Sequence, residues 1–140
     1  MPIALTDQMR DELASALENR VPALVASASP SGEPDIAYKG SVMVWDPEHL
    51  AYWERAHGQT RRNLESNPGV CVLFRNPESR LSWKFFGTAE VISSGDVRDD
   101  VMGRTIQAEL DRDPDRKGAA VVIRVDRVVQ AGQVIMQRDA

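Results

Sequence analysis

Apolar and polar positions alternate along most of the chain in short runs, which predicts a protein built mainly of β-strands. Each run is bounded by Pro, Gly, Asn, Asp or Ser residues, which favour turns. These features predict strands over residues 23–28, 35–45, 50–54, 70–74, 81–93, 119–129 and 134–136. Within the strand at 81–93, Gly87 marks the point where a bend is expected.

Apolar residues that recur at helical spacing predict helices outside these strands. The first covers residues 7–18, a short second helix over residues 61–67 is capped by Thr60, and a third covers residues 96–110. These strands, at hairpin spacing and with two or three peripheral helices, predict a single domain over residues 1–140. Its class is α+β, mainly β, and its expected architecture is a small antiparallel barrel.

The charge and composition of the chain exclude several classes of binding partner. A formal net charge of −4 and a pI of about 5.2 argue against binding to a nucleic-acid backbone. No stretch approaches the roughly 20 apolar residues of a membrane-spanning helix, so no membrane association is expected. A single cysteine and an N-terminus too acidic for a signal peptide predict a cytoplasmic protein. Two histidines and one cysteine are too few for a Cys/His zinc site, so no metal is expected.

The chain offers few groups for nucleophilic or acid–base catalysis. His49 lies in a predicted turn, and Cys71 lies in the middle of an apolar strand, where a buried and inert thiol is expected. Neither His49 nor His57 has a Ser or Cys partner in a suitable sequence context. The sequence therefore gives little support for nucleophilic catalysis.

A strand, a loop and a helix within residues 50–64 form a better candidate site. The start of a helix presents free N–H groups and a partial positive charge, which together suit a phosphate. Thr60 can add a hydroxyl donor there, and Arg61 or Arg62 can add a two-pronged guanidinium contact. A neighbouring strand that contains glycine would let a flat ligand lie against the backbone, with Lys39 facing its electronegative edge.

Several short motifs occur in an order that is more specific than any one of them. They are Gly32-x-Pro34 beside an apolar strand, Asn63-Leu64-x-x-Asn67-Pro68 in the short helix, and Gly87-x-Ala89-Glu90 in the long strand. In this order and spacing the chain resembles the pyridoxamine-5'-phosphate-oxidase-like, FMN-binding split-barrel family. The resemblance covers residues 23–93 and extends to the strand at 119–129.

The resemblance implies a split, Greek-key-like antiparallel β-barrel that forms a homodimer with FMN at its interface. It places the flavin ring along the second and third strands, at Tyr38, Lys39, Gly40, Ser41, Val42, Tyr52, Trp53 and Glu54. It places the phosphate near the basic residue of the second strand and at Gly58, Gln59, Thr60, Arg61 and Arg62. The other subunit of the dimer is expected to contribute its copies of Ser82, Trp83 and Lys84.

Two departures from the family's pattern limit what the resemblance implies. Many members have a lysine where this chain has Thr60. One of Lys39, Arg61 and Arg62 would then have to supply that charge. The chain also lacks the C-terminal extension with which true pyridoxamine-phosphate oxidases bind substrate, so that specific reaction is not expected.

The leading interpretation is an FMN-dependent oxidoreductase that acts on a small-molecule substrate. In such an enzyme the flavin carries the hydride or electron. The protein orients the flavin, excludes water from it and sets the charges around it. The alternatives are a deazaflavin-dependent reductase on the same fold, or a non-catalytic flavin- or haem-binding module with His57 as an iron ligand. A nucleic-acid-binding barrel is disfavoured by the acidic pI of about 5.2.

Overall fold

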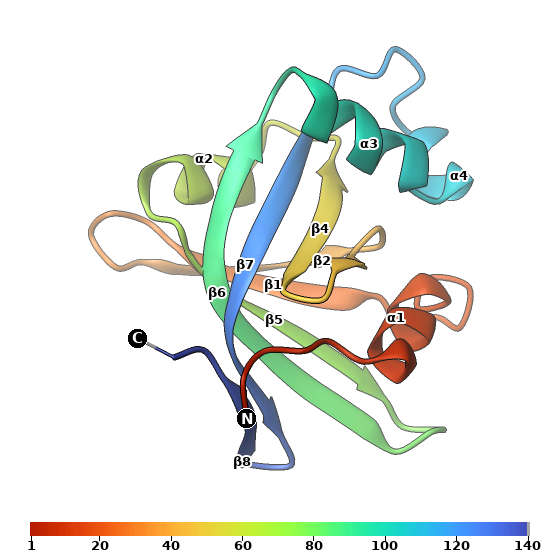
Figure 1. Cartoon of the computed structure of the whole chain (residues 1–140). Coiled ribbons are helices and arrows are strands. Elements are labelled where there is room, and N and C mark those ends of the chain that lie inside the picture. Colours follow the sequence, from red (N-terminus) through yellow and green to blue (C-terminus); the bar gives the residue numbers. More distant parts are fainter. Residues whose placement is uncertain (140) are drawn as a thin grey trace.

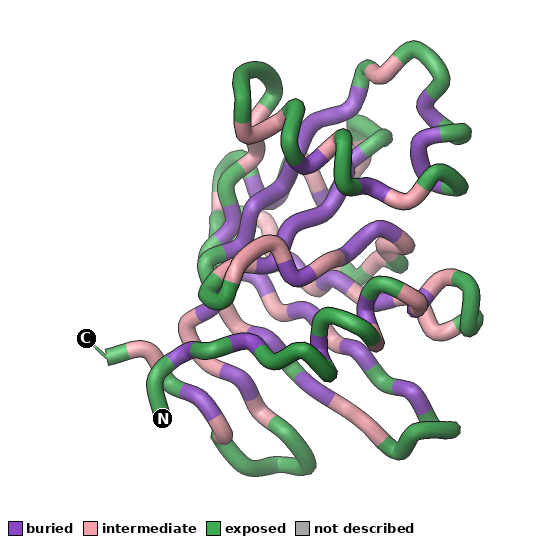
Figure 2. Tube along the Cα trace, turned by 45° about the vertical axis from the view of Figure 1, so that its right-hand side comes forward, coloured by how far each residue is buried: buried purple, intermediate pink, exposed green. Residues whose placement is uncertain are grey.

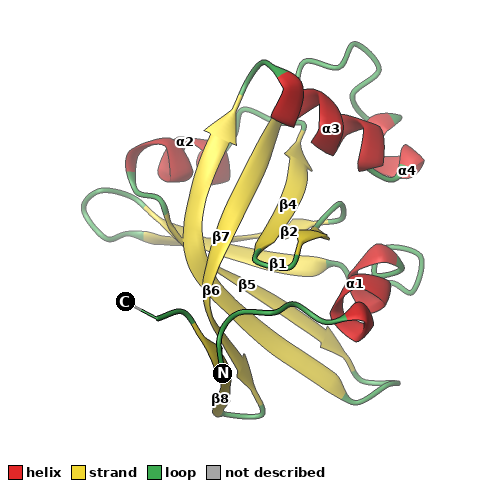
Figure 3. Ribbon diagram, in the orientation of Figure 1, coloured by secondary structure: helices red, strands yellow, loops and turns green. Residues whose placement is uncertain are grey.

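Eight antiparallel strands form one continuous, strongly bent sheet in the order β2-β1-β5-β6-β7-β4-β3, with β8 paired to β7 (Figure 1). The computed structural model describes residues 1–139. Its strands are β1 (Ala23–Ala28), β2 (Pro34–Lys39), β3 (Met43–Asp46), β4 (His49–Glu54), β5 (Gly69–Asn76), β6 (Leu81–Ile92), β7 (Ala119–Gln130) and β8 (Gln133–Gln137). Its helices, which lie around the outside of the sheet (Figure 3), are α1 (Asp7–Ala14), α2 (Gln59–Ser66), α3 (Asp96–Arg104) and α4 (Gln107–Leu110). The predicted mainly β, antiparallel fold with few helices is confirmed.

Side chains that point to the inside of the bent sheet form the main core. On β5 and β6 the inward positions, including Phe74, Trp83 and Phe85, are buried, whereas their outward neighbours are exposed or half-buried. The rings of Phe74 and Trp83 stack with their centroids 5.7 Å apart. A second, smaller core lies on the outside of β4 and β7, where Val101 of α3 packs against Ala51. Figure 2 shows the buried positions following the strands, while most loops are exposed.

The strand predicted over residues 35–45 is wrong, because this segment makes two strands at opposite edges of the sheet. β2 ends at Lys39 and β3 begins at Met43. At Gly40, between them, an added Cβ would collide with the carboxylate of Glu109 from α4, so only glycine allows the helix to pack this closely. Within the described part of the chain β2 and β3 do not pair with each other, which leaves the barrel split between them.

Two predicted helices also differ from the observed ones. The helix predicted over residues 7–18 ends as α1 at Ala14. The helix predicted over residues 96–110 is divided into α3 and α4, because Thr105 and Ile106 between them have extended backbone conformations. This break lets α3 pack on β7 and β4 while α4 turns toward the end of β2. None of the helices within residues 1–139 is long and apolar enough to cross a membrane.

The bend predicted at Gly87 is confirmed as an irregularity between β6 and β7. Phe86 pairs with Arg127 but Gly87 pairs with Val125, so Asp126 is an extra residue on β7. A Cβ at Gly87 would collide with the carbonyl of Arg124 on the neighbouring strand. The glycine therefore permits the close approach of the two longest strands at the point where they bend.

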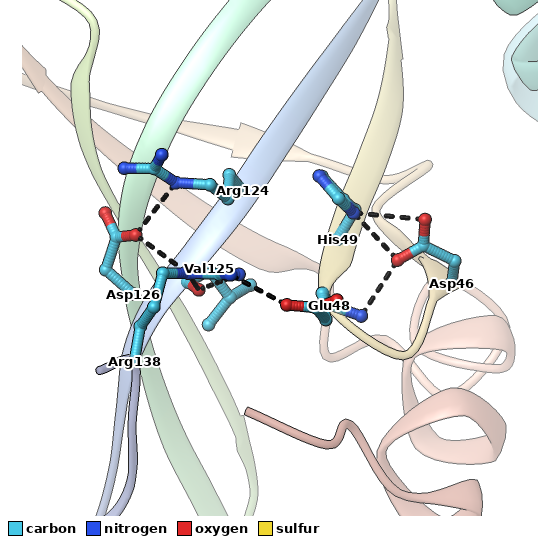
Figure 4. A network of polar contacts seen from close by, with 7 residues as sticks. All are labelled: Asp46, Glu48, His49, Arg124, Val125, Asp126 and Arg138. Atoms are coloured by element: carbon cyan, nitrogen blue, oxygen red, sulfur yellow. Dashed lines mark hydrogen bonds and ion pairs between the residues drawn. The ribbon is translucent and has the colours of Figure 1, made fainter. Parts of the chain in front are cut away.

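The turn between β3 and β4 holds both ends of the described chain. The backbone N–H of Leu5 donates to the carbonyl of Pro47 at 2.8 Å. Arg138 donates to the carboxylate of Glu48 at 2.7 Å and to the carbonyl of Val125 at 2.8 Å (Figure 4). The first and last segments therefore meet at one turn, although they are far apart in the sequence.

The side chain of Asp46 stabilises this turn through hydrogen bonds to other residues of the turn. Its carboxylate oxygens lie 2.8 and 3.0 Å from Nδ1 of His49, and one of them accepts the backbone N–H of Glu48 at 2.8 Å (Figure 4). Burial alone would raise the pKa of Asp46, but the Glu48 N–H and the His49 ring together lower it below its ordinary value. The carboxylate thus stays charged and keeps the turn in place.

Candidate functional site

The end of β2 meets the end of β4 at the mouth of the barrel. The side chains of β2 alternate, so Ala37 and Lys39 face the barrel whereas Ile36 and Tyr38 face outward. Lys39 Nζ donates a hydrogen bond to Glu54 Oε2 at 2.9 Å. Because β2 and β4 lie far apart in the strand order, this ion pair joins two parts of the barrel that backbone pairing leaves separate.

Glu54 is a carboxylate in an almost fully buried position. Its side chain is 2% exposed, and among residues 1–139 nothing donates a hydrogen bond to its second oxygen, Oε1. The hydroxyl of Tyr52, two residues earlier on the same face of β4, is likewise buried, and it interacts with the Glu54 carboxylate without forming a well-aligned hydrogen bond. Burial, then the charge of Glu54 and its hydrogen bonding to the phenol, raise the pKa of Tyr52 well above its ordinary value, so the phenol keeps its proton. A buried carboxylate oxygen without a well-formed hydrogen bond costs about 1–3 kcal/mol, so Glu54 favours a further donor besides Tyr52.

A polar cavity of about 80 Å³ opens over this ion pair. Arg55 and Glu109 line its outer side, with Arg55 Nε 3.1 Å from Glu109 Oε2. A wider hollow of about 230 Å³ shares Tyr38, Gly40, Arg55 and Glu109 with the cavity and continues along α4. Sequence reasoning missed two of these residues. Arg55 comes directly after Glu54, the last residue predicted for this part of the site. Glu109 lies far from β2 in the sequence, and no motif near it indicates that it packs there.

Ser41 and Trp53 form the back wall of the cavity and are held by the protein itself. The backbone N–H of Trp53 donates to Ser41 Oγ at 2.9 Å, and this hydroxyl donates to the Trp53 carbonyl at 3.3 Å. The Trp53 indole N–H donates to Asp113 at 3.0 Å, and the Arg98 guanidinium lies 4.9 Å from the ring centroid. Burial alone would raise the pKa of Asp113, but two backbone N–H groups and the Trp53 indole bring it below its ordinary value.

The start of α2 differs from the prediction. Gly58 is the N-cap, and no side chain of the described residues caps this end of the helix. Thr60 lies in the first turn and is buried, so its predicted role as the cap is wrong. The free N–H groups of the first turn remain as the donors that the sequence analysis expected there.

Arg61 and Arg62 point in different directions. Arg62 folds back over the helix start, where it donates to the carbonyl of His57 and to the side-chain oxygen of Gln59, both at 3.0 Å. Arg61 donates to the hydroxyl of Ser93 at 3.1 Å, on the other side of the helix. Of the two, Arg62 is therefore the one whose guanidinium lies at the N-terminus of α2.

The remaining predicted site residues divide between the core and the outer surface. Val42 and Trp83 are buried in the main core, and the Trp83 indole donates to Gln130 at 3.0 Å. Both side chains are therefore enclosed by the chain itself rather than open to the cavity. Ser82 and Lys84 point to the opposite face of β6, toward the outside of the sheet.

An apolar surface covers the outer side of β2, β1, β5 and β6 and reaches β7 and β8. The strand registers place its residues in two adjacent cross-strand rows, in which Lys84 and Arg127 are the charged members. Ile36 is 62% exposed and Tyr38 is 72% exposed. We call this surface the apolar outer face, and its residues are Leu24, Ala26, Ile36, Tyr38, Cys71, Leu73, Phe86, Val129 and Val134.

Cys71 lies in the middle of the apolar outer face and is half-buried there, rather than buried in the core as predicted. Burial raises the pKa of its thiol, and the charges of Lys84 and Arg127 offset only part of that effect. The thiol therefore stays protonated at neutral pH, in agreement with the expected inertness.

Comparisons with known proteins agree with this architecture. The family model for pyridoxamine 5'-phosphate oxidase matches residues 9–130. No curated protein sequence gives a significant match. The crystal structure of HupZ from Group A Streptococcus is 28% identical with a TM-score of 0.75, over 97% of this chain and 99% of that chain.

Two more distant structures share the fold. An FMN-binding protein from Syntrophomonas wolfei is 11% identical with a TM-score of 0.71, over 90% of this chain and 88% of that chain. An F420 reductase is 21% identical with a TM-score of 0.57, over 82% of this chain and 94% of that chain. Because the family model matches residues 9–130, which are most of this chain, the chain belongs to the pyridoxamine 5'-phosphate oxidase-like split-barrel family.

Proposed function

We propose that this chain is a flavin-binding oxidoreductase that holds its cofactor between two copies of itself and acts on a small-molecule substrate. The observation that carries the proposal is the family match over residues 9–130. The exposed ring of Tyr38 beside Gly40, next to a hollow of about 230 Å³, would suit a flat ring system. A bound flavin would supply hydride or electron transfer, and the chain would bind, orient and shield it.

The apolar outer face supports the proposed homodimer. Soluble monomers rarely leave a large continuous apolar surface in water, and a symmetric pair of copies would cover it. Tyr38 belongs both to this face and to the lining of the cavity. A second copy seated on the face would therefore reach the rim of the candidate site.

The candidate site suits the ring of FMN better than it suits the phosphate. The hollow beside Tyr38 is open enough for an aromatic ring. The two cations at the cavity, Lys39 and Arg55, are each already bound to a carboxylate of the chain. The residues present therefore fit a flavin ring but not a phosphate dianion next to Lys39, where the resemblance implies it.

A spectral titration tests the proposal. The purified protein is titrated separately with riboflavin, FMN, a deazaflavin and haemin. We expect saturable changes in the flavin bands at about 370 and 450 nm, with one flavin bound per chain. A response to the deazaflavin alone would favour the deazaflavin-dependent reductase, and a Soret-band response without a flavin response would favour a haem-binding module. Either result would overturn the flavin proposal.

A pair of variants locates the ring. We expect Tyr38→Ala to weaken flavin binding by about tenfold, because stacking on an aromatic side chain contributes about 1–3 kcal/mol. Ile36→Ala is the matched control, since Ile36 neighbours Tyr38 on the apolar outer face but does not line the cavity. Equal losses in the two variants would show that Tyr38 acts through the outer face rather than through contact with the flavin.

A further inference from the structure

We propose that Glu54 and Glu109 occupy the anion position of the candidate site, so that the site selects a ligand with a hydroxyl or another hydrogen-bond donor there instead of a phosphate. The inference rests on the proposed function, because it concerns the same site. Among flavins, it distinguishes riboflavin, whose side chain ends in a hydroxyl, from FMN, whose side chain ends in a phosphate.

The charges of the cavity are already balanced within the chain. Lys39 Nζ lies 2.9 Å from Glu54 Oε2, and Arg55 Nε lies 3.1 Å from Glu109 Oε2. A phosphate monoester carries a charge of about −1.5 to −2 at pH 7. Placed in the cavity, it would lie beside the carboxylates of Glu54 and Glu109, each already paired with a cation, and their charges would repel it.

The unsatisfied oxygen of Glu54 identifies the kind of group that the cavity favours. Glu54 Oε1 is buried and has no well-formed hydrogen bond among residues 1–139, with the Tyr52 phenol as a poorly aligned donor to the carboxylate, and Glu54 lines the cavity. A carboxylate accepts hydrogen bonds and donates none. A ligand hydroxyl or N–H group would satisfy Oε1, whereas a phosphate dianion has no hydrogen to donate.

The other predicted cations do not reverse this balance. Arg61 donates to Ser93 and lies 3.7 Å from Glu65, and it does not line the cavity, although its buried Nη1 has no acceptor among residues 1–139. Arg62 binds neutral oxygen atoms of His57 and Gln59, so it keeps an uncompensated charge outside the cavity, at the helix start. Arg62 therefore marks the competing position for a phosphate, and the experiment has to separate the two positions.

The test compares the dissociation constants of FMN and riboflavin for the full chain at one ionic strength. We expect riboflavin to bind at least about tenfold more tightly than FMN. Glu54→Gln removes the buried charge and frees Lys39, so it should shift the ratio of the two constants toward FMN by about tenfold or more. Glu78→Gln makes the same chemical change in the exposed β5–β6 turn and should leave the ratio of the two constants unchanged. Far-UV circular dichroism confirms that each variant is folded.

Two results would overturn the inference. One is tighter binding of FMN than of riboflavin with no change of the ratio in Glu54→Gln. If Arg62→Gln then removes the preference for FMN, the phosphate lies at the start of α2. The other is a similar affinity for both flavins in the wild type and in Glu54→Gln.

A second measurement applies even if neither flavin binds, in which case the proposed function fails but the inference is still tested. The ¹⁵N-labelled protein is titrated with millimolar inorganic phosphate. We expect the amide signals of residues 39–41 and of Arg55 to stay unchanged in the wild type and to shift in Glu54→Gln. Shifts of these signals in the wild type would show that the cavity accepts phosphate and would overturn the inference.

Discussion

Replacing Lys39 with Met would leave Glu54 buried without its counter-ion. Lysine and methionine side chains are of similar length. The substitution therefore removes a charge and a hydrogen-bond donor but keeps most of the apolar part of the side chain. Glu54 is 2% exposed and Lys39 is 16% exposed, so the carboxylate is the more deeply buried partner. Removing Lys39 should therefore be more damaging than removing the charge of Glu54.

The distance between the two charges sets the scale of the effect. At 2.9 Å and an effective dielectric constant of about 20, Coulomb's law gives an attraction of about 6 kcal/mol, much of which is offset by desolvation. Breaking a buried pair from one side costs about 3–5 kcal/mol, which we expect for Lys39→Met. For Glu54→Gln we expect a smaller cost of about 1–3 kcal/mol, because Lys39 can reach water. Lys39→Met combined with Glu54→Leu removes both charges and should lie within about 1 kcal/mol of the wild type or be more stable.

Urea denaturation at pH 7, followed by tryptophan fluorescence and circular dichroism, measures these free energies of unfolding. Lys117→Met is the matched control, since Lys117 is exposed in the connector before β7 and its loss should change stability little. A cost below about 1 kcal/mol for Lys39→Met would show that water screens the pair. A larger cost for Glu54→Gln than for Lys39→Met would contradict the assignment of Glu54 as the more buried partner.

Three further predictions concern other parts of the fold. Asp113→Ala leaves the Trp53 indole and two backbone N–H groups without their acceptor, so we expect a loss of about 3 kcal/mol in urea denaturation and a changed tryptophan emission. The pKa of Asp46 is lowered in the folded state, so the charged side chain stabilises the fold at pH values above the ordinary pKa of aspartate. This contribution is lost as the pH falls through the lowered pKa of the folded state. The Tm of Asp46→Asn should therefore fall less than that of the wild type under acid conditions. Light scattering at micromolar concentration should show a dimer for the wild type and a monomer for Ile36→Asp, which puts a charge on the apolar outer face; a wild-type monomer would refute the proposed interface.

The strands could be predicted where apolar runs and turn residues coincide, as for β1, whose predicted and observed bounds agree. The errors occur where distant segments decide the outcome. Gly40 lies in a region of strand-like sequence, but Glu109 of α4 packs against it and the chain turns there. The break between α3 and α4 at Thr105 likewise follows from two different packing surfaces, which periodicity within a single helix cannot reveal.

Several residues that line the cavity could be named from the sequence, but the ion pairs between them could not. Lys39 and Glu54 were both predicted at the site, and their ion pair appears only when β2 and β4 are brought together. The sequence alone does not distinguish Arg61 from Arg62 as the donor to an anion. Successive residues of an α-helix point about 100° apart, and here the two guanidinium groups take different partners, Ser93 for Arg61 and the His57 carbonyl for Arg62. The N-cap lies two residues earlier than predicted, and this displacement buries Thr60.

The turn between β3 and β4 has a consequence for local unfolding. It accepts the N–H of Leu5 through Pro47 and binds the side chain of Arg138 through Glu48, so one short segment restrains both ends of the described chain. Opening of this turn should release the two ends together, as one cooperative unit. In hydrogen exchange, the amide of Leu5, which donates to Pro47, should report this opening directly. The amide of Arg138, which donates to Asp126, should follow it because Glu48 holds the Arg138 side chain. A substitution of Asp46 should accelerate both while leaving the amides of β5 protected.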